Sequence, residues 1–304
     1  MMLGSGYMCT KGLREEFNRQ GVLNYAFDTC GPDFIDKEEF CKYPIFYIRG
    51  FLQGRMPWVE AGGEQFKATL QSESFYTRHG KIDPSSTMIR PREKFFGLFI
   101  TFAESDLNMY NVPTVWMPSW ADITVLGDVS APEIDQLGFI GCTQGREDWF
   151  RQDKHKQILH RQTELSRSAD INAQRYTSLI NKFKILVAPP GRSFNSMTGR
   201  VFEIMACRRL CLAYVNPDTM FKHMELFKDG EDYVTWETFD EMMDKYKYYI
   251  EHQDEMWRIA TNGYNKVRKY NNQELAARYI YESVTAASKG EKVVNYDEWA
   301  KVCV

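Results

Sequence analysis

The chain has 304 residues, of which 43% are hydrophobic and 26% are charged, and its formal net charge is −3. This length and composition predict a soluble protein of two domains and exclude an intrinsically disordered chain. The small negative charge excludes a protein whose whole surface is basic, as in many general nucleic-acid binders.

Targeting segments and disulfides are not expected. No apolar run approaches the roughly 18 to 20 residues that cross a bilayer, and residues 1–7 do not resemble a secretion signal. The seven cysteines are scattered, and no pair has the C-x-x-C spacing that is typical of a zinc or redox site. We therefore expect a cytoplasmic protein, in the host cytoplasm if it is viral, whose cysteines are free thiols.

The N-terminal part contains short strand-like segments separated by long irregular stretches. Residues 11–20 have helical character that ends at Gly21, and a strand at 22–27 then runs into Asp28. A glycine turn, helix, strand and acid in this order are typical of a βαβ unit, although almost no sequence is left for the first strand of the unit. Further strands are predicted at 45–48, 66–70, 95–102 and 114–117.

Beyond about residue 130, strand and helix patterns alternate. The predicted elements are a strand at 137–141, helices at 147–168 and 171–182, a strand at 184–188, a helix at 199–208, a strand at 210–215, and helices at 239–252 and 254–268. This alternation predicts an α/β protein with a parallel sheet that is covered by helices on both faces. We divide the chain into domains 1–130 and 131–304, and the last helix can pack back on the first domain.

The segment between the strand at 184–188 and the helix at 199–208 carries the clearest indication of chemistry. Ligands bind beyond the carboxyl ends of strands in open parallel sheets, and a helix N-terminus favours a phosphate there. At Thr198 and Gly199 the backbone can approach a diphosphate closely, because glycine has no side chain. The carboxylate of Glu203, one turn into the helix, can accept hydrogen bonds from both hydroxyls of a ribose. Without further support, a glutamate in a first helical turn is more often a surface residue whose negative charge interacts favourably with the helix dipole.

A family resemblance supports the ligand-binding interpretation. Residues 200–207, Arg-Val-Phe-Glu-Ile-Met-Ala-Cys, are similar to the R-x-F-E-x-x-A-C signature of the CgeB-like branch of the group 1 glycosyltransferases. Shorter similarities to that family lie upstream at 116–122 and 137–146 and downstream at 226–233 and 263–279, in the order that the family has them. The resemblance therefore covers about residues 114–282. It implies the GT-B fold, in which two Rossmann-like domains face a cleft. Here the reduced N-terminal domain would bind the acceptor and the C-terminal domain the nucleotide sugar.

The resemblance also implies roles for individual residues. Glu203 would hold the ribose of the donor, and Arg146 and Arg200, with Lys154 behind them, would neutralise its diphosphate. Many GT-B enzymes have a second glutamate on the donor sugar, eight residues earlier, where this chain has Asn195. An asparagine can still form a hydrogen bond with a sugar hydroxyl, but without the charge of a carboxylate.

Two further points concern the same helix. Arg208 and Arg209 replace the glycine that usually follows "A-C" in the family, so we expect the helix to end differently and to present extra positive charge. Arg200 has an alternative role, since it can form a surface salt bridge with Glu203 or Glu147.

The catalytic base is less well defined. Inverting transfer needs a group that takes the proton of the acceptor hydroxyl, and in GT-B folds it comes from the N-terminal domain, whereas a retaining enzyme can leave it out. His79 is the first candidate, followed by Asp28, Asp122 and Asp106. No D-x-D pair follows a strand and no His and carboxylate cluster has ligand spacing, so we expect no metal and no cofactor besides the nucleotide-sugar co-substrate.

The sequence thus predicts a hexosyl- or pentosyltransferase that moves a sugar from a nucleotide diphosphate, which we expect to be UDP, to an acceptor hydroxyl. One alternative is a viral enzyme that modifies a hydroxymethylated base in DNA, because residues 142–209 contain thirteen Lys or Arg against six Asp or Glu. The loop residues Trp58, Tyr76 and Arg78 are the candidates for binding DNA or another acceptor. A second alternative is a non-catalytic protein that keeps the GT-B fold and binds a nucleotide or a partner, which Asn195 and the short first strand favour.

Overall fold

The computed structural model describes residues 19, 25–28, 45–48, 68–71, 96–108, 110–131, 133–141, 159–162, 173–189, 198–215 and 225–304. Among these residues the chain forms two compact units. The first unit comprises residues 19–118 and 274–304, and the second unit comprises residues 119–273. The second unit therefore begins at Ser119, whereas the sequence placed the boundary near residue 131, and the chain returns to the first unit after Gln273.

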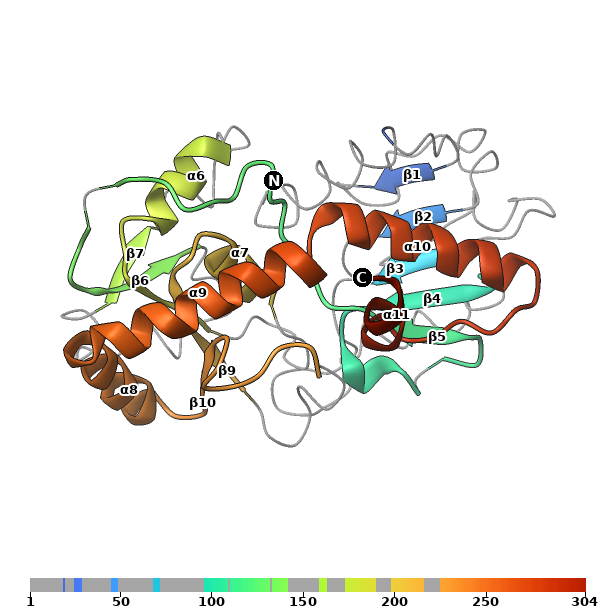
Figure 1. The fold of residues 1–304 in the computed structure, drawn as a ribbon. Coiled ribbons are helices and arrows are strands. Elements are labelled where there is room, and N and C mark those ends of the chain that lie inside the picture. Colours follow the sequence, from blue (N-terminus) through green and yellow to red (C-terminus); the bar gives the residue numbers. More distant parts are fainter. Residues whose placement is uncertain are drawn as a thin grey trace. The chain divides into compact units, whose positions relative to one another are not determined.

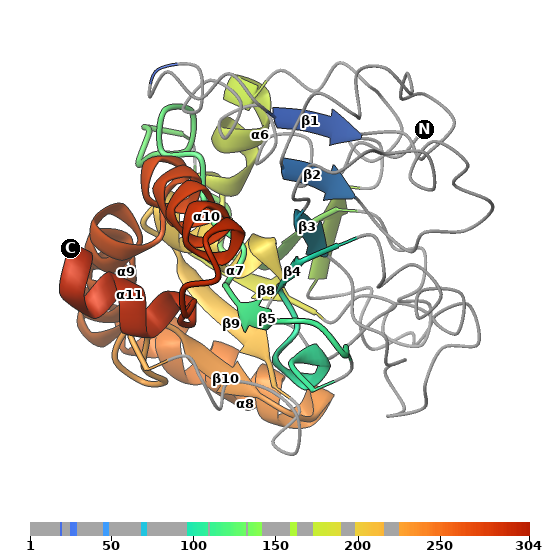
Figure 2. The same cartoon turned by 90° about the vertical axis from the view of Figure 1, so that its right-hand side faces the viewer.

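The described part of the first unit contains a five-stranded sheet whose spatial order follows the chain (Figures 1 and 2). Every strand is parallel to its neighbour, so each connection must carry the chain back to the same edge of the sheet. The strands are β1 (Tyr25–Asp28), β2 (Ile45–Ile48), β3 (Ala68–Gln71), β4 (Leu98–Thr101) and β5 (Thr114–Trp116), and a 3-10 turn, η4 (Glu104–Asp106), lies between the last two. These positions confirm the strands predicted in this part of the sequence.

The C-terminal helices α10 (Gln273–Ser288) and α11 (Tyr296–Cys303) contribute to the first unit, apart from the first residue of α10. The backbone N–H of Trp116, at the end of β5, donates to the Asn295 side chain over 2.8 Å. The hydroxyl of Tyr279 donates to the carbonyl of Val294, also over 2.8 Å. These bonds fix the turn between the two helices against the sheet.

The described part of the second unit contains another parallel five-stranded sheet, with the order β10-β9-β8-β6-β7. Its strands are β6 (Leu137–Ile140), β7 (Leu159–Gln162), β8 (Ile185–Ala188), β9 (Leu210–Tyr214) and β10 (Val234–Trp236). The chain adds β7 on one side of β6 and then β8, β9 and β10 on the other side. In such doubly wound sheets the ligand binds beyond the carboxyl ends of the two strands where the order reverses, which are β6 and β8 here.

Helices α6 (Ala173–Ile180), α7 (Gly199–Ala206), α8 (Phe239–Glu251) and α9 (Gln253–Tyr270) complete the described second unit. The long helix α9 packs along α7 and β9 (Figure 1). β6, β8 and most of β9 are fully buried, which explains why their sequences are almost continuously apolar. Within the described residues, no helix has both the length and the apolar character that a membrane span requires.

One predicted helix is wrong where the structure describes it. The polar helix expected at 147–168 contains β7, which pairs with β6 from Leu137 opposite Leu159 to Ile140 opposite Gln162. Among the described strands, β7 lies at the edge of the sheet with β6 as its one neighbour, and an edge strand tolerates the polar sequence Leu-His-Arg-Gln. The rest of 147–168 lies outside the described residues.

The C-terminal end of α7 also differs from the expectation. Arg208 has a φ of 55°, in the left-handed region that favours glycine. Its N–H bonds to the Met205 carbonyl over 2.9 Å, and the N–H of Arg209 bonds to the Ile204 carbonyl over 3.3 Å. This is the Schellman pattern of a glycine-ended helix, formed here by an arginine. The prediction of a different helix end is therefore wrong, because the backbone geometry is retained despite the substitution.

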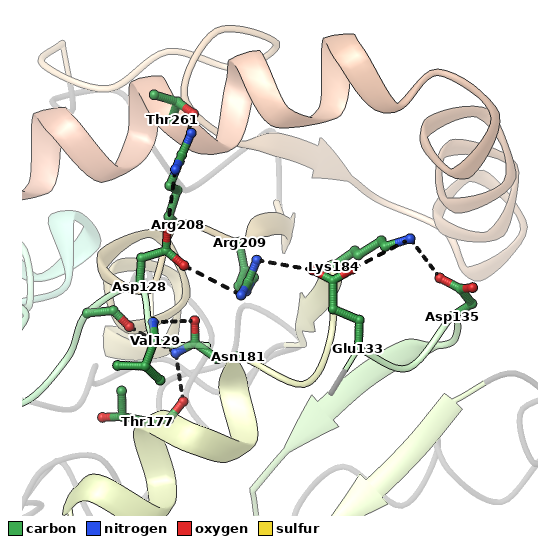
Figure 3. Close-up of polar contacts among 11 residues, drawn as sticks. Asp128, Val129, Glu133, Asp135, Thr177, Asn181, Lys184, Arg208, Arg209 and Thr261 are labelled. Atoms are coloured by element: carbon green, nitrogen blue, oxygen red, sulfur yellow. Dashed lines mark hydrogen bonds and ion pairs between the residues drawn. The ribbon is translucent and has the colours of Figure 1, made fainter. Parts of the chain in front are cut away.

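The expected extra positive charge is neutralised as well (Figure 3). Three basic side chains of the second unit face three acidic side chains of the segment 128–135. The pairs are Arg208 with Asp128, Arg209 with Asp128 and Glu133, and Lys184 with Glu133 and Asp135. The guanidinium of Arg209 is nearly buried and also lies over the Trp257 ring. These ion pairs connect the segment 128–135 to the rest of the unit and offset the three positive charges.

Candidate functional site

The helix α7 begins directly beside the switch point of the second sheet. Thr198 precedes it with an extended backbone, and its side chain does not cap the helix. The first N–H groups of an α-helix have no partner within the helix itself. A Cβ placed on Gly199 would lie 2.7 Å from the hydroxyl oxygen of Ser119. An alanine at this position would therefore require the Ser119 hydroxyl to move. A role of Thr198 and Gly199 at the diphosphate stays a prediction.

Glu203 lies inside the second unit and not on its surface. Its exposed fraction is 1%, which rules out the common role of a solvated glutamate at a helix start. The hydroxyl of Tyr176, in α6, donates to Oε2 of Glu203 over 2.6 Å. The other oxygen, Oε1, is buried without a hydrogen-bond partner among the described residues. An unpaired buried acceptor is unfavourable, so such an atom is an indication of a site that a ligand completes.

The electrostatics of this pair follow from burial. Burial raises the pKa of Glu203, while the positive charge of Arg200 and the hydrogen bond from Tyr176 act in the opposite direction. The pKa of Tyr176 is raised by burial and then by the negative charge of Glu203, so the tyrosine stays a hydrogen-bond donor at neutral pH. The carboxyl group is therefore kept in a position where its charged form is costly.

Arg200 lies across the carboxyl end of β6. Its guanidinium carbon is 5.1 Å from the centre of the Phe139 ring. A Cβ placed on Gly141 would lie 2.6 Å from both terminal nitrogens of Arg200, so the glycine that follows β6 leaves the room that the guanidinium occupies. The side chain is half-buried, and its Nε has no partner among the described residues. A surface salt bridge with Glu203 does not fit the burial of that carboxylate, and Glu147, the other predicted partner, lies outside the described residues.

These groups provide complementary chemistry at one place. The end of β6 and the helix that follows β8 supply a guanidinium, a free carboxylate oxygen and the positive end of a helix dipole. An anion such as a diphosphate is favoured by the first and the third, and a hydroxyl donor by the second. The arrangement suits a ligand that carries both a phosphate group and a sugar hydroxyl.

The positions of the carboxylates predicted as catalytic bases do not test that role. Asp122 is buried, and Oδ1 of its side chain accepts bonds from the N–H and the hydroxyl of Thr124, over 3.1 and 2.5 Å. It is thus part of the turn that opens the second unit. Asp106 is fully buried in η4, and Asp28 ends β1. A catalytic role for any of them stays a prediction.

Several predicted site residues lie outside the described part of the chain. They are His79, Asn195, Arg146, Lys154, Trp58, Tyr76 and Arg78. The structure adds two residues that the sequence did not single out as site residues, Tyr176 and Gly141. Gly141 belongs to the motif Gly-Phe-Ile-Gly, so a strand that ends in glycine was a usable signal. Tyr176 gave no such signal, because it precedes Glu203 by 27 residues and only the packing of α6 brings the two together.

Comparisons with known proteins agree with this geometry. The family model described as "Glycosyl transferase-like" matches residues 123–281, which is more than half of the chain. No curated protein matches the sequence. The narrower resemblance to the CgeB-like branch stays a prediction.

Solved structures of glycosyltransferases share the fold. Sucrose-phosphate synthase from Thermosynechococcus elongatus superimposes with a TM-score of 0.65 at 12% identity, over 93% of this chain and 94% of that chain. AviGT4, a glycosyltransferase involved in avilamycin A biosynthesis, gives 0.59 at 11% identity, over 95% and 91%. HepE from Anabaena in complex with UDP-glucose gives 0.58 at 10% identity, over 82% and 80%. With the family match, these likenesses show that the chain belongs to the glycosyl transferase-like family and is a glycosyltransferase with the GT-B fold.

Proposed function

We propose that the protein transfers a sugar from a UDP-sugar to an acceptor hydroxyl without a metal ion. The observation that carries the proposal is the buried Oε1 of Glu203 at the switch point of the second sheet, which has no hydrogen-bond partner in the described part of the chain. A ribose hydroxyl would donate to this atom. The uridine nucleotide is supported by HepE, whose structures were solved with UDP and with UDP-glucose.

In this proposal the diphosphate is bound by Arg200 and the start of α7. Negative charge develops on the diphosphate as the sugar leaves, and fixed donors aimed at that charge lower the barrier. The guanidinium already lies at the carboxyl end of β6, so it needs little rearrangement. The absence of a D-x-D pair after a strand in the sequence supports stabilisation by protein groups in place of a metal ion.

The proposal names the acceptor only as a hydroxyl group. A DNA acceptor was motivated by the basic excess of residues 142–209, and Lys184, Arg208 and Arg209 belong to that excess. All three are paired with acidic side chains of the same unit (Figure 3). The excess therefore gives less support to a DNA acceptor than the sequence suggested.

A nucleotide panel tests the donor. UDP and one UDP-sugar are expected to raise the melting temperature, whereas GDP, ADP and uridine leave it unchanged at equal concentration. A ligand present at a hundred times its Kd stabilises by about 2.7 kcal/mol, which at about 2–4 °C per kcal/mol corresponds to a shift of about 5–11 °C. Differential scanning fluorimetry measures the shift, and calorimetry gives the Kd. If no uridine nucleotide stabilises the protein, the donor assignment is wrong.

The same UDP-sugar provides a test of turnover. Slow release of UDP in the absence of acceptor is expected, because water can replace the acceptor hydroxyl. The rate should be equal with and without EDTA if no metal takes part. A rate that falls on adding EDTA and returns with Mg²⁺ or Mn²⁺ would contradict the metal-free proposal while leaving the donor site intact.

Gly141→Ala tests the assignment of Arg200. The new methyl group would overlap the guanidinium and force it away, so the affinity for UDP should fall about tenfold, the value of one charge-assisted hydrogen bond. Gly141 has a φ of 153°, so we also expect a loss of about 1 kcal/mol in unfolding free energy. Gly290→Ala is the matched control, because Gly290 has a φ of 75° and nothing within 4 Å of the added Cβ. It should lose stability without a change in UDP affinity, and a Gly141→Ala variant with unchanged affinity would remove Arg200 from the diphosphate site.

A further inference from the structure

The two oxygen atoms of the Glu203 carboxylate are in different surroundings. Oε2 accepts the 2.6 Å bond from Tyr176, whereas Oε1 has no partner among the described residues. An ionised carboxylate can accept several hydrogen bonds on each oxygen. Here one oxygen is engaged by the protein before any ligand binds.

The partner of Oε2 is held firmly in place. Tyr176 is 6% exposed and lies in α6, whose later residues are tied to the segment 125–129. The Thr177 hydroxyl donates to the carbonyl of Val125 over 2.7 Å, and the Asn181 amide donates to the carbonyl of Gly127 over 2.9 Å. Figure 3 shows Thr177 in this helix and Asn181 directly after its last residue, with Val129 donating its N–H to Asn181. The position of the tyrosine hydroxyl is thus set by tertiary contacts and not by the ligand.

We propose that Tyr176 is a positioning residue that fixes the Glu203 carboxylate and leaves Oε1 as the one oxygen that binds the ribose of the donor nucleotide. The inference rests on the proposed function, since it concerns how the nucleotide is recognised at that site. Tyr176 does not touch the nucleotide. It acts by preventing the carboxylate from rotating and by stabilising its charged form, which is the better acceptor for a hydroxyl.

Two consequences distinguish this role from plain packing. Without the tyrosine hydroxyl, Glu203 loses its orientation, so the preference for UDP over 2′-deoxy-UDP or 3′-deoxy-UDP should shrink. The carboxylate also loses a donor, so its pKa should rise further. The other group that acts on this carboxyl among the described residues is Arg200, on α7, whose positive charge lowers the pKa of Glu203. Tyr176→Phe removes the hydroxyl that interacts with both Glu203 and Arg200, while the positive charge of Arg200 is retained.

The experiment is a double-mutant cycle read by calorimetry with UDP, 2′-deoxy-UDP and 3′-deoxy-UDP. It compares the wild type with Tyr176→Phe, Glu203→Gln and the double variant. Tyr176→Phe is expected to weaken UDP binding about tenfold and to reduce the preference over at least one deoxynucleotide. In the Glu203→Gln background the same change should weaken UDP binding less than threefold, because the hydrogen bond from Tyr176 then orients an uncharged amide. As the pH is lowered, the affinity of Tyr176→Phe should begin to fall at a higher pH than that of the wild type.

Two controls make the outcome decisive. Tyr279→Phe removes another buried tyrosine hydroxyl, which bonds to Val294 in the first unit, and it should leave all three affinities unchanged. Tyr176→His keeps a ring donor and should retain part of the preference that Tyr176→Phe loses, and it serves if the phenylalanine variant does not fold. Wild-type affinities and a wild-type pH profile in Tyr176→Phe would overturn the inference. If instead the wild type does not bind UDP, or Glu203→Gln binds it normally, the proposed function itself is wrong.

Discussion

Glu203→Gln is expected to make the protein more stable at neutral pH and to weaken its binding of nucleotide. The carboxylate is buried, one of its oxygens has no partner within the residues that the structure describes, and burial raises its pKa, so its charge destabilises the folded state. Glutamine has nearly the same shape and can accept the Tyr176 bond, but it has no charge to bury. We expect a gain on the order of 1 kcal/mol, which is about 2–4 °C in melting temperature.

The pH dependence of this gain has a definite sign. Because the pKa of Glu203 is higher in the folded state than its ordinary value of 4.5, the folded protein binds this proton more tightly than the unfolded chain does. The penalty is absent below the ordinary pKa, grows as the pH rises from that value to the folded-state pKa, and is constant at higher pH. The difference in melting temperature between variant and wild type should therefore be largest at neutral pH and vanish near about pH 4.

The affinity should change in the opposite direction. A ribose hydroxyl that donates to a carboxylate loses the charge-assisted part of that bond in the variant, so the Kd for UDP should rise about 10-fold to 100-fold. Glu251→Gln, an exposed glutamate of α8, is the matched control and should change neither stability nor affinity. A Glu203→Gln variant that is less stable than the wild type at neutral pH would contradict the cost assigned to the buried charge. Unchanged affinity would contradict the ribose assignment.

The parts of the site that are local in sequence were predictable. The apolar strand at β8 and the helix at α7 follow from hydrophobic pattern, and Glu203 follows from its place one turn after Thr198 and Gly199. The same reasoning placed most strands, because each has its own apolar run between turn residues. The polar strand β7 was missed because an edge strand needs no such run.

The features that depend on tertiary packing were not predictable from one sequence. The burial of Glu203 depends on α6, which brings Tyr176 to it, and the role of Gly141 appears only when Arg200 lies across the end of β6. The strand order that makes β6 and β8 the switch point also cannot be read from a linear pattern. At Arg208 the rule that such a helix end needs a glycine was misleading, since the packed helix end imposes a left-handed backbone conformation on an arginine.

Gly263→Ala is expected to cause a large loss of stability through the contact between α9 and α7. Gly263 is buried in the middle of α9, where alanine would normally be favoured by up to about 1 kcal/mol. Here an added Cβ would overlap the backbone carbonyl of Asp232 and would lie 3.0 Å from the sulfur of Met205 in α7. The carbonyl cannot move alone, because the Asp232 side chain accepts from Lys266 and from the N–H of Lys228, over 2.6 and 2.8 Å.

We therefore expect the overlap to outweigh the helix propensity and to lower the unfolding free energy by about 2–3 kcal/mol, or about 4–12 °C in melting temperature. Gly127→Ala is the matched control, since its added Cβ would have its nearest contact at 3.6 Å, and it should stay within about 0.5 kcal/mol of the wild type. If Gly263→Ala is as stable as the wild type, the turn at 228–232 can yield. In that case the movement of this turn relieves the overlap, and the packing of α9 on α7 is retained.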